Sequence, residues 1–358
     1  MKGLKFVLPL LLLATLQSCV EKKKDNYDRT AMLTNLGNNI IVPGYQQLAA
    51  ATQALQTQTT AFTNAPSNQT LDSLKVAYRA AYFKYMAVEV YDFTPSQYMR
   101  NSFNSFPADT TQINNNIGSG TYDFTSAANY SAKGFPALDY LLYGADAATV
   151  ISNFTTGGSA ANRRQYLTDI VNELNLKSGE ANSGWSNGYL ATFIQASGTD
   201  LGSSTGMLVN DLSMELERNR RERVGNSLGY VGIVSGGNIL PGALEAYYSN
   251  QSKELLLENL QQMKLLFEGG TGTGFDDYLN QIGADYNGTP LATEISTQFN
   301  KSILAAQNVP VDFKTALTTN KPEMEALFLE LKRLVVLVKV DMSSQLGVII
   351  NYTDNDGD

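Results

Sequence analysis

Apolar residues recur at helical spacing along most of this chain of 358 residues. Within residues 71–88, 167–174, 256–267 and 327–338, apolar side chains follow the i, i+3, i+4, i+7 pattern of a helix with one buried face. No sustained alternation of apolar and polar residues appears, and only Val348–Tyr352 resembles a strand. The sequence therefore predicts an all-α protein.

The segments around these helices carry two further expectations. Residues 30–63 are rich in Gln, Thr and Ala and are predicted to form one long helix, bent at Pro43-Gly44. The longest polar break is Thr94–Tyr130, and loops beyond about 12–15 residues are often functional. Its aromatic side chains either pack inward or present a binding surface; they are Tyr98, Phe103, Phe106, Tyr122, Phe124 and Tyr130.

The N-terminus has the features of a cleavable lipoprotein signal. Lys2 and Lys5 precede an apolar stretch that is shorter than the roughly 20 residues needed to span a bilayer. The stretch ends in Leu-Gln-Ser before Cys19, which is the only cysteine of the chain and so cannot form an internal disulfide. We expect residues 1–18 to be removed, Cys19 to be lipidated and residues 19–29 to form a charged tether.

This lipid would make the membrane the first partner of the protein. Each buried methylene contributes roughly 0.8 kcal/mol, and stable anchoring takes more than one acyl chain. A bacterial lipoprotein cysteine normally carries three chains. The expected location is therefore the bacterial cell envelope, at the outer membrane, on its periplasmic or surface face.

About 340 residues remain after processing, which suggests two domains. Long helices separated by polar breaks favour helical bundles, whose sites lie between facing helices. We expect two four-helix-type bundles over residues 30–180 and 181–352, followed by an acidic tail at 353–358.

Charge argues against a nucleic-acid partner. The mature chain has 24 basic and 34 acidic residues, a net charge of about −10, and lacks a large basic face to neutralise phosphates. The cationic run from Arg218 to Arg223 is interpreted as a solvated helix end, with Gly225 as the stop.

The chain contains no histidine, which limits its chemistry more than any other feature. A Ser-His-Asp triad and a zinc or haem site with histidine ligands are excluded. Any metal would be held by oxygen ligands, which suit Mg, Ca, Mn and ferric iron. The C-terminal residues Asp354, Asp356 and Asp358 are either a plain acidic tail or part of a weak calcium site completed elsewhere.

Glycine-rich residues 269–274 lack the Lys-Ser/Thr of a P-loop and are predicted to be a loop between helices. The segment 134–144 is more informative: a proline near its start, an apolar run and a closing glycine indicate a short capped helix.

This segment resembles the signature of the imelysin-like family, Gly-x-His-x-x-Glu followed by an aromatic residue, two leucines and a glycine. Gly134 matches the glycine, Pro136 stands at the histidine position and Asp139 at the glutamate position. Other family segments match in the same order, and the resemblance covers most of residues 30–358. They are 77–93 with Glu89, 106–109, 163–193 with Trp185, 223–229, 245–269 with Glu245, and 346–348.

The resemblance implies an all-helical protein of two bundles with a site between them, a cell-envelope location and a role in iron acquisition. Some members have been proposed to be peptidases. In this chain, proline cannot bind a metal or accept a proton, and no other histidine replaces it. A peptidase would therefore depend on the carboxylates alone.

We therefore expect a binding protein for iron or an iron compound, acting as an envelope transport or receptor component. Its ligands would come from Glu89, Asp139 and Glu245, with Tyr140 or Tyr143 as phenolate donors, although helical spacing favours both tyrosines as core residues. One alternative is a degenerate-site scaffold that binds a partner, glycan or peptide through Thr94–Tyr130. The other is a metallopeptidase-like hydrolase.

Overall fold

A computed structural model describes residues 26–231 and 236–352. The predicted signal peptide, Cys19, most of the tether and the aspartates of the acidic tail lie outside these residues. No helix in the described ranges is both long enough and apolar enough to cross a membrane.

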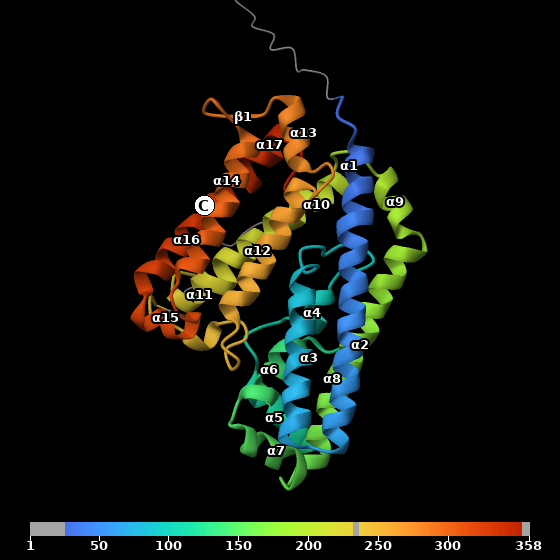
Figure 1. Ribbon diagram of the computed structural model, residues 1–358, viewed down its shortest axis with the longest axis vertical. Helices are drawn as coiled ribbons and strands as arrows, with labels where there is room; N and C mark the ends of the chain where they lie inside the picture. Colours follow the sequence, from blue (N-terminus) through green and yellow to red (C-terminus); the bar gives the residue numbers. More distant parts are fainter. Residues whose placement is uncertain (1–25, 232–235, 353–358) are drawn as a thin grey trace, which may run out of the picture.

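The described chain is all-α apart from one two-stranded hairpin, which confirms the predicted fold class. Figure 1 shows two lobes, one from the first half of the chain and one from the second. The bounds of the elements of the first lobe are α1 Arg29–Leu36, η1 Gly37–Ile41, α2 Val42–Asn64, α3 Asn68–Met86, α4 Met99–Phe103, α5 Thr110–Ser119, η2 Ala127–Ala132, α6 Gly134–Tyr143, α7 Ala147–Thr155, α8 Ala160–Gly184, η3 Trp185–Tyr189 and α9 Leu190–Gln195.

The elements of the second lobe are α10 Ser204–Arg218, η4 Asn219–Gly225, α11 Asn226–Leu228, η6 Pro241–Ala243, α12 Ser252–Glu268, α13 Phe275–Ile282, β1 Asp285–Tyr286, β2 Thr289–Pro290, α14 Leu291–Asn308, α15 Phe313–Thr319, α16 Lys321–Val336, η7 Leu337–Met342 and α17 Ser343–Leu346.

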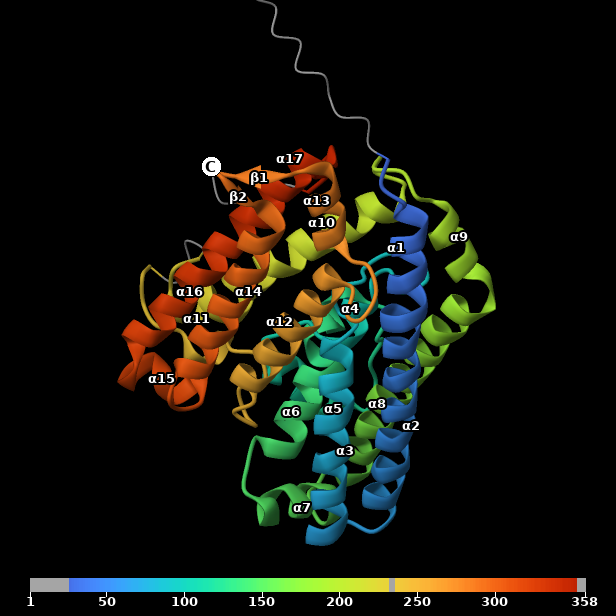
Figure 2. The ribbon, with the colours of Figure 1, turned by 45° about the horizontal axis from the view of Figure 1, so that its top comes forward.

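In the first lobe, α2 packs along α3 and α8, and the shorter α5, α6 and α7 complete the bundle (Figures 1 and 2). In the second lobe, α14 packs against α12 and α16, and α10 packs on α16. Contacts of α12 with α3 join the lobes. The predicted division between residues 180 and 181 falls inside α8, which is continuous to Gly184.

The helix predicted over residues 30–63 is confirmed, and its irregular turn lies just before Pro43. The backbone stays helical from α1 through the π-helical η1 into α2. Proline has no N–H for a helical hydrogen bond, and a π turn accommodates such a break in the ladder.

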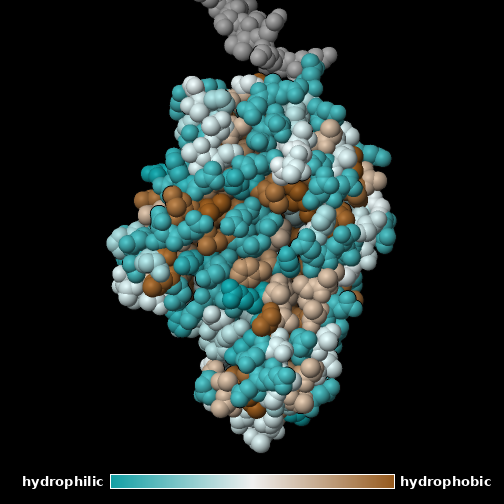
Figure 3. Space-filling model, in the orientation of Figure 1, coloured by the Kyte–Doolittle hydropathy of each residue, from teal (hydrophilic) through white to brown (hydrophobic). Residues whose placement is uncertain are grey.

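The apolar residues predicted to face the core do so. Leu71, Leu74, Tyr78, Leu256 and Leu327 are fully buried, and the other members of these stripes are buried too, except Phe328 on α16, which is half-buried. On the face of the molecule that Figure 3 shows, apolar patches are scattered over a mainly hydrophilic surface.

The strand expected near the C-terminal end of the described chain is absent, and a hairpin lies elsewhere. Val348–Tyr352 forms no strand, because its backbone is held by the side chain of Asn210, which donates to the Ile349 carbonyl (2.9 Å) and accepts from the Asn351 amide (2.8 Å). The hairpin lies instead at β1–β2, where Asp285 pairs with Pro290 across an Asn-Gly turn, a strong hairpin signal.

The segment Thr94–Tyr130 is not one long loop, since it contains α4, α5 and the start of η2. Asp109 caps α5 by accepting from the Gln112 amide, a capping signal present in the sequence. The aromatic side chains divide: Phe103 is fully buried, Tyr98 is 65 % exposed and the others are half-buried. The glycine-rich residues 269–274 do join two helices, α12 and α13.

Candidate functional site

A buried ionic cluster lies between the lobes, with Arg223 at its centre. The guanidinium donates from Nε to Glu245 Oε2 (2.7 Å), from Nη1 to Glu215 Oε1 (2.6 Å) and from Nη2 to Glu89. All four residues are at most 5 % exposed. We call Arg223, Glu89, Glu215, Glu245 and Asn104 the Arg223 cluster.

Neutral side chains complete the cluster. The Asn104 amide nitrogen donates to Glu89 Oε1 (3.0 Å) and to Glu245 Oε1 (2.6 Å). The Tyr82 hydroxyl lies 2.6 Å from Asn104 Oδ1 and 3.0 Å from Glu245 Oε1. Glu89 and Glu245, two of the three predicted ligand carboxylates, are thus brought together, but as partners of an arginine.

The cluster forms because the segment of Asn104 converges with three others. Glu89 lies one turn beyond α3, Glu215 lies on α10, and Arg223 lies on the π-helical η4 that continues α10. Glu245 precedes α12. Pi-helical turns recur at functional sites, and here the turn carries the only residue that contacts all three glutamates among those described.

The electrostatics follow from one buried cation among three carboxyl groups. Burial raises the pKa of Glu89 to about 7, with Arg223 opposing the shift and Glu215 and Glu245 adding to it. Burial also disfavours the charged form of Glu215, but Arg223, Arg218 and Arg100 outweigh it and lower its pKa. For Arg223, burial alone lowers the pKa, while Glu245, Glu89 and Glu215 together raise it.

The arginine run is therefore not a solvated helix end, which corrects the expectation from the sequence. Arg223 is 2 % exposed, and Gly225 does not stop the helix, which continues to Leu228 and ends at Gly229 with φ 77°. Gly225 instead permits close packing, because a Cβ there would lie 2.9 Å from the Phe328 ring.

A cavity of about 380 Å³ opens beside the Arg223 cluster, between the lobes. Arg100 joins the two, since its Nε lies 3.6 Å from Glu89 Oε1 and its Nη2 donates to Glu222. We call this cavity the cleft. Its lining residues are Arg100, Ser105, Phe106, Pro107, Arg221, Glu222, Asn226, Val231 and Ala243.

Asp139 lies apart from the other predicted carboxylates. Its Oδ2 accepts from the Tyr248 amide (2.7 Å), and its Oδ1 accepts from the Ser249 amide (3.1 Å) and the Tyr78 hydroxyl (3.3 Å). Burial raises the pKa of Asp139 to about 6, against the opposing effect of these hydrogen bonds. Asp139 thus attaches α6 to the segment that carries Glu245.

The rest of segment 134–144 has a structural explanation. Gly134 has φ 68°, and a Cβ there would lie 2.4 Å from the Phe103 carbonyl oxygen, so this position requires glycine. Pro136 lies in the first turn of α6, where a helix leaves its N–H groups unpaired. Pro136 and Asp139 line a small cavity of about 130 Å³ with Phe106 and Tyr248.

The two tyrosines of α6 have other partners. The Tyr140 hydroxyl accepts from the Asn114 amide (2.9 Å), and the Tyr143 ring lies 4.6 Å from Lys75 Nζ. Within residues 26–231 and 236–352, no group of three or more Asp, Glu, Cys or His side chains could hold a metal ion. Of the predicted oxygen ligands, Glu89 and Glu245 lie together at Arg223, whereas Asp139, Tyr140 and Tyr143 have separate partners.

The family model described as imelysin, peptidase family M75, matches residues 41–338. The chain belongs to the imelysin family. In the described fold, Pro136 and Asp139 line the small cavity at the junction of the two lobes.

Two solved structures share the imelysin fold. An imelysin-like protein from Psychrobacter arcticum 273-4 is 17% identical with a TM-score of 0.69, covering 91% of this chain and 97% of that one. A protein from Parabacteroides distasonis ATCC 8503, named as an iron-regulated protein A precursor, is 15% identical with a TM-score of 0.73, covering 92% and 97%. A search of curated proteins gives no match.

Proposed function

We propose that this imelysin is a lipid-anchored envelope protein that binds an anionic iron compound, such as ferric citrate, in the cleft, and that it has no peptidase activity. The proposal rests on one observation. The carboxylates of Glu89 and Glu245 form ion pairs with Arg223, whereas Arg100 and Arg221 line the cavity beside them. The cleft thus carries two guanidinium groups and one carboxylate, that of Glu222, which accepts from Arg100.

A chelate fits this arrangement better than a bare ion. If a metal cation displaced Arg223 from its glutamates, the buried guanidinium would lose its partners, at a large cost in free energy. Arginine side chains recognise carboxylates and phosphates through paired N–H groups, and Phe106 adds an apolar wall. The name of the Parabacteroides protein connects this fold with iron regulation and supports the choice of cargo.

Loss of the motif histidine supports the absence of peptidase activity. A metallopeptidase uses a bound metal to activate water, and this chain has no histidine to hold one. The remaining motif carboxylate, Asp139, already accepts two backbone N–H bonds.

The anchor would be a lipid on Cys19, the residue at which the signal pattern ends. The first described residues are fastened to the second lobe, where Tyr27 stacks on Tyr278 with ring centroids 4.5 Å apart. The anchor would keep the protein at the outer membrane, where a transport component could accept the cargo. Cys19→Ala should release the protein from the membrane fraction; retention would contradict the anchor.

Calorimetry tests the binding proposal. Ferric citrate should give saturable heat, whereas Ca²⁺ should not. Arg221→Gln should weaken ferric citrate at least tenfold, and Arg333→Gln, which alters a 62 % exposed side chain on α16, should have no effect. Absence of heat with ferric citrate, or equal affinities for the two variants, would refute the site.

A further inference from the structure

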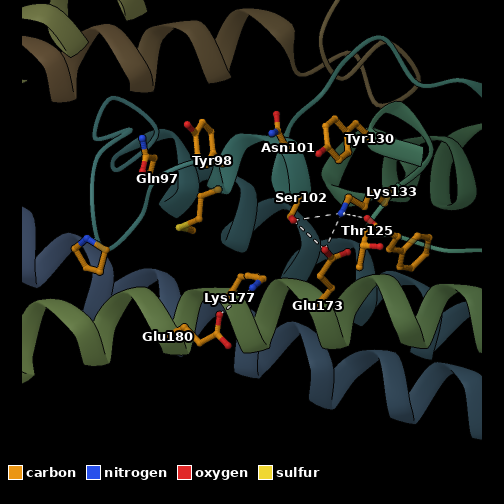
Figure 4. A pocket seen from close by; sticks show the side chains of 13 residues that line it. Gln97, Tyr98, Asn101, Ser102, Thr125, Tyr130, Lys133, Glu173, Lys177 and Glu180 are labelled. Carbon is orange, nitrogen blue, oxygen red and sulfur yellow. Dashed lines mark hydrogen bonds and ion pairs between the residues drawn. The ribbon is translucent and has the colours of Figure 1, made fainter. Parts of the chain in front are cut away.

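A second cavity, of about 310 Å³, lies wholly within the first lobe. It is bounded by residues 95–102, residues 124–133 and α8, and shares no lining residue with the cleft. Figure 4 shows Tyr98, Asn101 and Tyr130 along one side, Glu173, Lys177 and Glu180 of α8 along the other, and Ser102 and Lys133 between them. We call it the Lys133 pocket.

The floor of the pocket contains an acceptor with unused capacity. Lys133 is 2 % exposed, and its ammonium donates to the Phe124 carbonyl (2.6 Å), Glu173 Oε1 (2.7 Å) and Ser102 Oγ (3.3 Å). These bonds use its three hydrogens. Glu173 Oε1 also accepts from Ser102 (2.9 Å), whereas Glu173 Oε2 is buried without a hydrogen-bond partner. A ligand hydroxyl would supply the missing donor after a rotation of the carboxylate.

The rim holds an aromatic side chain in a strained position. Tyr98 has φ 63°, which is an outlier for a bulky residue, and its amide is fixed by donation to Asp92 Oδ1 (2.7 Å). Tyr98 is 65 % exposed, so packing of its side chain does not compensate for the backbone strain. Strained backbone conformations that the surrounding structure maintains are concentrated at ligand-binding and active sites.

The charges of the pocket balance internally. Lys133 pairs with Glu173, and Lys177 pairs with Glu180 at 3.0 Å. The pocket therefore has no net charge that would attract an ionic ligand. The neutral side chains of Gln97, Asn101 and Thr125 line the same cavity and offer both donors and acceptors.

We propose that the Lys133 pocket binds a neutral saccharide of one or two rings. Sugar rings present C–H faces that pack on aromatic rings, here Tyr98 and Tyr130, and hydroxyls that pair with amides and carboxylates. The cavity volume is at the lower end of the range of about 300–1,000 Å³ for ligand pockets, which suits a small ligand. This site is independent of iron binding in the cleft.

The test begins with an array of neutral and anionic oligosaccharides, followed by calorimetry with the strongest neutral glycan. The purified chain should bind neutral glycans saturably. Tyr98→Gly should bind at least tenfold more weakly while its thermal midpoint stays equal or rises, because glycine adopts φ 63° without strain. Tyr230→Ala, which removes a 46 % exposed ring from the second lobe, should bind as the natural chain does.

Glu173→Gln should also weaken the neutral glycan severalfold, because an amide replaces the free acceptor. Ferric citrate binding should be unchanged in Tyr98→Gly, so the failure of either site can be distinguished from the other. The proposal is overturned if no neutral glycan binds, if only anionic glycans or peptides bind, or if Tyr98→Gly keeps full affinity.

Discussion

The Arg223 cluster and the Lys133 pocket each bury a cation, but they use it differently. Arg223 contacts three carboxylates from segments of both lobes, and the side chains of Glu89, Glu215 and Glu245 are at most 1 % exposed. Lys133 has one carboxylate partner, Glu173, whose side chain is 18 % exposed. The first arrangement leaves no capacity for a ligand and joins the lobes, whereas the second leaves an acceptor at a cavity.

Removal of the central arginine should have the largest effect. Arg223→Met leaves three buried glutamates without their cation, and we expect a loss of about 3–5 kcal/mol in the free energy of unfolding, measured by urea at neutral pH. The loss should shrink at pH 5, where the glutamates can protonate. Arg221→Met, two residues away at the edge of the cleft, should cost less than about 1 kcal/mol. Similar losses for both variants would show that Arg223 has no special role.

Lys133→Met should cost less, about 2–3 kcal/mol, because it removes charge-assisted hydrogen bonds but leaves only one carboxylate unpaired. Glu173 would also keep the hydrogen bond from Ser102. Urea unfolding of the two variants side by side measures the order. A greater loss for Lys133→Met than for Arg223→Met would reverse the comparison.

Asp139→Asn should cost about 1–2 kcal/mol, since the amide oxygen keeps one backbone bond and the other backbone N–H faces an NH₂ group. Because Asp139 attaches α6 to the segment before α12, the variant should also increase hydrogen exchange at residues 245–251. Exchange that increases only within α6 would contradict this connecting role.

Asp211 gives the smallest effect and a pH dependence. Burial raises its pKa to about 8, while the Asp92 amide, which donates to it at 2.8 Å, opposes the shift. The folded state thus holds a proton that the unfolded state releases near pH 4, so stability falls as pH rises from about 4 to 8. Asp211→Asn mimics the neutral form and should raise stability at pH 8 by about 1 kcal/mol, with little change at pH 5. Thermal melts at the two pH values decide it, and a decrease at pH 8 would show that the carboxylate is needed in its charged form.

Much of the fold could be predicted because helical periodicity is a local property. The stripes containing Leu71 and Leu327 are set by neighbours three and four residues away, and both residues are buried as expected. The pairing of Asn210 with the chain end could not be predicted in this way, because it joins positions 139 and 141 residues apart.

The site was predicted in part. Glu89 and Glu245 do lie together, but the burial of Arg223 depends on a contact with Glu89 across 134 residues, which a run of arginines at a helix end does not reveal. The partners of Asp139 are backbone N–H groups, which leave no side-chain pattern in a sequence.

The most direct test is the position of iron in crystals soaked with ferric citrate, located by anomalous diffraction at the iron edge. We predict a peak in the cleft, near Arg100, Arg221 and Phe106, with the Arg223 cluster intact. A peak bound directly by Glu89 and Glu245, with Arg223 displaced, would contradict the claim that these carboxylates are structural.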